Sequence, residues 1–133
     1  HWLGRKDYLD LPAYLANWQA GWMPFALNDA TRFISPTKTP EFLAAGLPVV
    51  STAVPDVVEG YGRSGLVAVA DADGIAAALR RALDSPAPGW LQRADNVLAA
   101  MSWDRTWSAM AAQMQARLPV ALPVTPASQV EHA

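Results

Sequence analysis

A lysine and a glutamate, Lys38 and Glu41, lie three residues apart in the segment SPTKTPEFLAAG. Three residues with hydroxyl side chains, Ser35, Thr37 and Thr39, flank the lysine in the sequence. An ammonium group attracts phosphate oxygens as a point charge, and the free N–H groups of a helix start also favour anions. A carboxylate accepts hydrogen bonds from a diol, such as the two hydroxyls of a ribose. The segment therefore carries the groups that bind a nucleoside diphosphate.

The same residues also fit an ordinary helix start. Thr39 is expected to be the N-cap and Pro40 the first helical residue, so Glu41 falls in the first turn. An acidic side chain there complements the helix dipole by about 0.3–1 kcal/mol. Lys38 is then a solvated lysine, and the chain has neither of the common glycine-rich phosphate loops. Local physical chemistry leaves both interpretations open.

Composition excludes several other kinds of site. The 133 residues are 52% hydrophobic and 17% charged, which is typical of a globular domain, and a net charge of -2 gives no basic surface for nucleic acid. The chain has no cysteine, and its two histidines, His1 and His132, stand at the ends, so we expect no metal site. The lack of cysteine favours a cytoplasmic location. Within the cytoplasm, the inner face of the membrane is an alternative place for the protein. We expect no transmembrane segment, because no apolar run reaches about 20 residues.

Hydrophobic patterns predict short buried strands that alternate with helices. Strands are expected at residues 1–4, 22–25, 47–51 and 65–70, and helices at residues 11–18, 40–45, 75–83, 90–100 and from 103 onward. This alternation indicates an α/β fold whose parallel sheet has helices on both faces. Ligands bind such sheets at the carboxyl ends of the strands, where the loop of residues 28–39 is expected. We expect one domain over residues 1–118 and a flexible tail over residues 119–133.

Five motifs in this order resemble the nucleotide-sugar-binding domain of GT-B glycosyltransferases, close to the retaining family 4 group. They are Glu41 followed by FLAAG, then PVV at 48–50, PD at 55–56, GLV at 65–67, and the SWD helix start at 102–104. Residues 1–25 are also similar to the elements that precede this pattern. The resemblance implies a partial Rossmann-like parallel sheet, the C-terminal lobe of the GT-B fold without its first strands.

The resemblance also implies roles for individual residues. Glu41 would bind the ribose hydroxyls of a nucleoside-diphosphate sugar, while Ser35, Thr37 and Lys38 would face the diphosphate. Arg5 would lie near the base, and the alternative that Arg5 and Lys6 are a solvated surface pair is the stronger one. Lys38 and helix N-termini would stabilise the leaving diphosphate in place of a metal, so we expect no cofactor. No catalytic residue is assigned.

Two positions depart from the family pattern. The family often has another acidic residue eight positions before the conserved glutamate, where this chain has Phe33. Asp56 replaces a usual glutamate, and we expect it to support the structure of its loop.

The implied function is the donor-binding part of a retaining glycosyltransferase of the hexosyltransferase type. Its acceptor would be a polysaccharide, a glycan or a lipid precursor. We expect the chain to be part of a longer protein and inactive without an N-terminal acceptor lobe. A sheet edge exposed by missing strands would also favour homo-oligomers. The alternative function is a degenerate, non-catalytic scaffold module, which Phe33 and the missing lobe favour.

Overall fold

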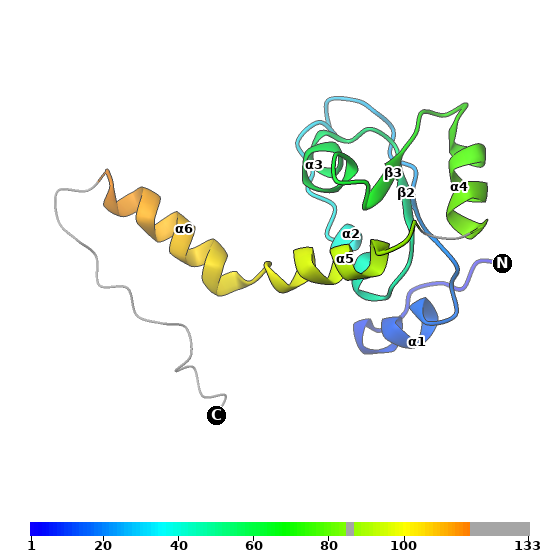
Figure 1. Ribbon diagram of the computed structural model, residues 1–133, viewed down its shortest axis with the longest axis horizontal. Coiled ribbons are helices and arrows are strands. Elements are labelled where there is room, and N and C mark those ends of the chain that lie inside the picture. The colour runs from blue at the N-terminus through cyan, green and yellow to red at the C-terminus, as the bar shows by residue number, and fades with distance from the viewer. Residues whose placement is uncertain (85–86, 118–133) are drawn as a thin grey trace. The chain divides into compact units, whose positions relative to one another are not determined.

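The computed structural model describes residues 1–84 and 87–117, and the fold is α/β, as the sequence predicts. The chain divides into two units, one of residues 1–98 and one that begins at Ala99. Within the described part of the first unit, three strands form a parallel sheet in the order β1-β2-β3 (Figure 1). These strands are β1 (Gly21–Met23), β2 (Val49–Ser51) and β3 (Val67–Val69).

Helices and helical turns connect these strands. Proline begins two of them, because its missing N–H is harmless in a first helical turn: Pro12 lies early in α1 and Pro55 opens α3. The elements are η1 (Tyr8–Asp10), α1 (Leu11–Leu15), α2 (Lys38–Ala44), α3 (Pro55–Val57), the π-helical turn η2 (Val58–Gly62), α4 (Ile75–Asp84), α5 (Trp90–Ala99) and, in the second unit, α6 (Trp103–Gln115).

The sheet has helices on both faces, as its apolar strands require. Successive side chains of a strand point to opposite faces, and in β2 both Val49 and Val50 are buried. Val49 belongs to the main core cluster, which includes residues of α2, α3 and α5. Helix α4 contacts β2 and β3 and buries Ala78. Figure 1 shows α4 on one side of the strands and α2 and α3 on the other.

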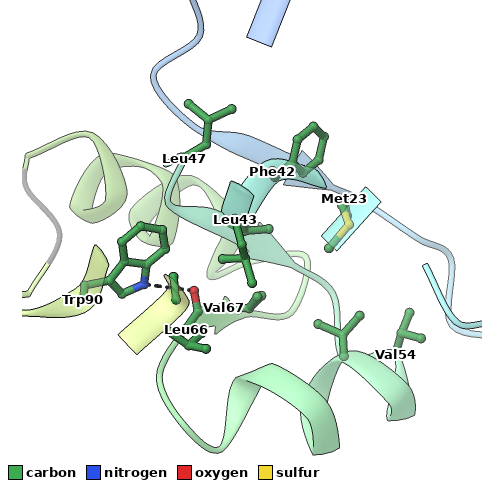
Figure 2. Packing of buried hydrophobic residues seen from close by; sticks show 11 residues of the cluster. Met23, Phe42, Leu43, Leu47, Val54, Leu66, Val67 and Trp90 are labelled. Carbon is green, nitrogen blue, oxygen red and sulfur yellow. Dashed lines mark hydrogen bonds between the residues drawn. The ribbon is translucent and has the colours of Figure 1, made fainter. Parts of the chain in front are cut away.

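The main core joins α2 and α5 to the sheet, and Figure 2 shows its side chains. Leu43 of α2 is fully buried among Leu66, Val67 and other apolar side chains. Trp90 opens α5, and its indole N–H donates to the carbonyl oxygen of Leu66 at 3.1 Å. This hydrogen bond satisfies the one polar atom of a buried aromatic side chain and fixes α5 against the residue before β3.

Helix α2 lies close against β1, and a glycine permits this approach. A Cβ atom at Gly21 would lie 2.5 Å from Cδ2 of Phe42. The ring of Phe42 is also 6.1 Å, between centroids, from the ring of Trp18. The strand and the segment after α1 therefore hold the helix that carries Lys38 and Glu41.

The predicted strand at residues 1–4 is wrong. These residues form no regular element, and the side chain of Trp2 is 95% exposed. A parallel strand needs a neighbouring strand to satisfy its backbone, and the described residues provide none beside this segment. The strand predicted at 65–70 is confirmed, but Ala68 and Val69 are exposed because β3 is an edge of the described sheet. The predicted tail of residues 119–133 lies outside the described residues.

Two further features concern the expected exposed edge of the sheet and the expected lack of a transmembrane segment. Strand β1 is the other edge of the described sheet, and the side chain of Trp22 on it is exposed. No helix within residues 1–84 and 87–117 combines the length and the apolar character needed to cross a membrane.

We predict that Gly21→Ala lowers the free energy of unfolding by about 1–3 kcal/mol, because the new methyl group overlaps the ring of Phe42. Urea unfolding measures this change. Gly60→Ala is the matched control, since a Cβ at Gly60 meets no atom within 4 Å. Equal stability of the two variants would contradict the close packing of α2 on β1.

Candidate functional site

The first turn of α2 carries an ion pair at the surface of the first unit. The ammonium group of Lys38 donates to Oε2 of Glu41 at 2.6 Å. The lysine side chain is 50% exposed and the glutamate side chain 24% exposed. This contact uses one of three ammonium protons and one of two carboxylate oxygens. Both groups can therefore hold a ligand without first separating.

The helix begins earlier than the sequence predicts. A turn in which Thr39 N–H donates to the carbonyl oxygen of Pro36 at 3.1 Å leads into it, and Thr37 takes the N-cap position. The predicted N-cap, Thr39, is therefore wrong. Its side chain is fully buried, and its hydroxyl lies 3.7 Å from the sulfur of Met23. Because of this orientation Thr39 stabilises the packing of α2 on β1, whereas Thr37 and Lys38 are exposed.

Glu41 lies at the wall of a cavity of about 380 Å³ between α1 and α2. Residues three and four apart share one face of a helix, so Ala44 and Ala45 line the same wall as Glu41. Their small side chains leave the space open. The opposite wall comes from η1, α1 and the residue after α1: Tyr8, Leu11, Pro12, Leu15 and Ala16. The cavity is thus apolar, with an aromatic ring on one wall and a carboxylate on the other.

A second hollow of about 260 Å³ lies at the carboxyl ends of β1 and β2. Polar side chains line it from the loop after β1, and the side-chain oxygen of Asn28 accepts hydrogen bonds from the N–H groups of Ala30 and Thr31 at 3.0 and 3.1 Å. The other lining residues are Leu27, Asp29, Arg32, Ala53 and Pro55. A turn that is stabilised by hydrogen bonds to the side chain of Asn28 therefore forms part of the rim of this hollow.

Phe33 follows this turn, at the position where the family resemblance implies an acidic residue. Its side chain is 83% exposed, and the guanidinium carbon of Arg32 lies 5.3 Å from the centre of its ring. The pair is a cation–π contact at the surface. The position therefore supplies no carboxylate to the neighbouring hollow.

A hydrogen bond joins the loop before α2 to the start of α3. The hydroxyl of Ser35 donates to Oδ2 of Asp56 at 2.8 Å. Tyr61 of η2 lies near the same carboxylate. Burial raises the pKa of the Tyr61 phenol above its ordinary value of 10.0, and the negative charge of Asp56 raises this pKa further. Asp56 therefore faces both the loop of Ser35 and the helical turn that follows it.

The structure brings together part of the predicted site. Ser35, Thr37 and Lys38 are exposed along the segment that leads into α2, and the partly exposed Glu41 follows them at the wall of the cavity. Arg5 is exposed and is absent from the residues that line the cavities described here.

Sequence reasoning missed Tyr8 and Leu11 as walls of the cavity, and Asp56 as the partner of Ser35. The helical pattern did place α1, but no sequence signal indicated that α1 lies opposite Glu41. Within the described part of the chain, no group of three acidic, histidine or cysteine side chains is arranged to hold a metal ion.

Comparison with known proteins adds one finding. The chain matches the family described as glycosyl transferases group 1 over residues 1–85. This match covers more than half of the chain and includes β1 to β3, α1 to α4 and both hollows. Searches among curated proteins and among solved structures give no significant match.

We predict that the raised pKa of Tyr61 makes the stability of the protein fall at alkaline pH. The unfolded chain releases this proton near the ordinary pKa of 10.0, while the folded chain keeps it to higher pH. The contribution is complete below the ordinary pKa and is lost as pH rises through the raised one, so the free energy of unfolding decreases over this range.

Urea unfolding from about pH 9 to pH 11.5 measures this slope. Tyr61→Phe should flatten it, and Asp56→Asn should give an intermediate slope because burial remains as the larger cause. Identical slopes in the wild type and Tyr61→Phe would refute the assignment.

Proposed function

Since the chain belongs to the group 1 glycosyl transferases and has a GT-B-type α/β domain, we propose that its first unit binds the nucleoside-diphosphate sugar of a retaining glycosyl transfer. The observation that carries this proposal is the position of Glu41, a partly exposed carboxylate at the wall of an apolar cavity and in contact with a lysine. A carboxylate suits the ribose of a nucleotide, an apolar cavity suits its base, and a lysine suits its diphosphate.

The ribose lies at Glu41 in this proposal. Oε2 of Glu41 already accepts from Lys38, and its second oxygen offers further lone pairs to the hydroxyls of a diol. A hydrogen bond to a charged group contributes about 1.5–3 kcal/mol, so this contact would orient the nucleoside strongly.

The base lies in the cavity between α1 and α2. A volume of about 380 Å³ is within the range of small-molecule sites and suits a flat heterocycle. Tyr8 and Leu11 on one wall and Ala44 on the other offer aromatic and apolar surface to the faces of the ring. Arg5, three residues before Tyr8, stays a candidate for the edge of the base, as the resemblance implies.

The diphosphate lies beside Lys38 and Thr37, which are exposed at the start of α2. The ammonium group keeps two protons for phosphate oxygens while it remains bonded to Glu41. Lys38 would stabilise the charge that develops on the leaving diphosphate, and it would do so without a metal. The transferred sugar would then lie at the hollow of Asn28 and Asp29, at the carboxyl ends of the strands.

The acceptor completes the proposal. We propose a hexosyl transfer to a polysaccharide, a glycan or a lipid precursor in the cytoplasm, with the acceptor held by a second, N-terminal lobe. The chain alone would then be inactive, because the reaction needs both lobes of the cleft.

A second candidate function is a non-catalytic scaffold module with the same fold. Phe33 favours it, since an exposed phenylalanine stands where an acidic residue would contact the donor. The two candidates differ in whether the protein binds a nucleotide.

We predict that a nucleoside diphosphate raises the melting temperature of the full-length protein and that Glu41→Ala removes this effect. The panel is UDP, GDP, ADP and dTDP, and loss of the carboxylate should weaken binding about 10-fold or more. The ion pair itself is exposed and contributes about 0–1 kcal/mol, so the variant should stay folded.

Glu59→Ala is the matched control, because Glu59 also forms an exposed ion pair, with Arg63 at 2.7 Å. It should keep the wild-type response. An equal response in Glu41→Ala would refute the ribose contact, and a folded wild type that responds to no nucleotide would support the scaffold function.

A further inference from the structure

Two loops meet at the carboxyl ends of β1 and β2. The loop after β1 runs over residues 24–37 and leads into α2, and the loop after β2 runs over residues 52–54 and leads into α3. One side-chain hydrogen bond connects these two loops, and another connects the loop after β1 to α3. The hydroxyl of Thr52 donates to the carbonyl oxygen of Phe25 at 2.8 Å, close to the strands. The hydroxyl of Ser35 donates to Asp56 at 2.8 Å, close to the start of α2.

The hydrophobic core holds the backbone around Asp56 in place. Val57 directly after it and Val54 two residues before it are both fully buried, and Pro55 directly before it fixes the backbone at the start of α3. Tyr61 packs against the same core and lies near the carboxylate. The exposed side chain of Asp56 therefore projects from a backbone that the core holds in place.

Ser35 has less support, and its position affects the ligand-binding residues. Ile34 before it packs against the core, while the side chain of Ser35 is exposed. Pro36 after it accepts the hydrogen bond from Thr39 that leads into α2. Lys38 lies between Pro36 and Thr39 in the sequence, so a displacement of Ser35 would move the ammonium group of Lys38 as well.

We propose that Asp56 is a positioning residue for the donor diphosphate: its carboxylate holds Ser35 and thereby the segment that presents Thr37 and Lys38. This inference rests on the proposed function. A serine hydroxyl has one proton, and here Asp56 accepts it. Asp56 thus acts through Ser35, and in this proposal the Ser35 hydroxyl proton is used by Asp56 instead of by the diphosphate.

The charge of Asp56 makes the proposal testable, because charge and hydrogen bonding have opposite effects. A carboxylate near a diphosphate repels it, so loss of the charge alone would strengthen binding. Loss of the hydrogen-bond acceptor would release Ser35 and weaken binding. Asp56→Asn removes the charge and keeps an acceptor oxygen, whereas Asp56→Ala removes both.

The experiment is isothermal titration of the full-length protein with UDP, GDP and ADP, and with uridine, guanosine and adenosine. For the diphosphate that binds best, Asp56→Ala and Ser35→Ala should each raise Kd about 5-fold, which corresponds to one ordinary hydrogen bond. The double variant Ser35→Ala/Asp56→Ala should bind this diphosphate no more weakly than Asp56→Ala does. Asp56→Asn should bind as tightly as the wild type or more tightly.

The parent nucleoside separates positioning from general damage. It has no phosphate, so its affinity should be equal in the wild type and in Asp56→Ala. A variant with a damaged fold would weaken both ligands. Asp95→Ala, at an exposed aspartate of α5, is the matched control and should change neither affinity.

Two results would overturn the inference while the proposed function stands. One is wild-type diphosphate affinity in a folded Asp56→Ala variant. The other is full additivity of Ser35→Ala and Asp56→Ala, which would mean that Ser35 contacts the ligand directly. If the wild type binds no nucleoside diphosphate, the proposed function fails and the role of Asp56 fails with it.

Discussion

The burial of one face of α2 is the constraint on which the candidate site depends. A helix of seven residues is not stable by itself in water, so its position comes from packing. Thr39, Phe42 and Leu43 are buried against the sheet and core. Because Glu41 lies between these residues in sequence, the helical period turns it away from the core and toward α1. The packing of Phe42 over Gly21 thus decides where the carboxylate points.

The charged groups of the site contribute little to the stability of the fold. An exposed ion pair such as Lys38–Glu41 is worth about 0–1 kcal/mol, because water competes for both partners. The same exposure lets both groups take a ligand at low cost. Stability comes instead from the apolar contacts behind them, where Leu43 is fully buried. In this arrangement, changes to the site and changes to the fold are separable.

The loops at the carboxyl ends of the strands are held by hydrogen bonds between residues far apart in the sequence. Ser35 and Asp56 are 21 positions apart, and Thr52 and Phe25 are 27 positions apart. Each bond joins a segment of irregular backbone to one anchored in the core. A parallel sheet makes such contacts possible, since the ends of its neighbouring strands lie at one edge. The polar loops of the site are therefore supported by side chains, in addition to their own turns.

The sequence by itself determined the class of fold and the main candidate residue. Alternating apolar runs predicted the parallel sheet, Pro12 indicated a helix start, and Glu41 with the motifs that follow it pointed to the family. These features are local, because strand and helix periods and proline geometry act within a few residues.

Only the tertiary structure decided the rest. An apolar run at residues 1–4 looked like a strand, but a strand exists only beside a partner, and the described residues supply none. The tertiary packing also buried Thr39 against Met23, placed Tyr8 and Leu11 opposite Glu41, and paired Ser35 with Asp56. The physical reason is that each of these contacts joins residues from different elements, whose distances are set when the elements pack.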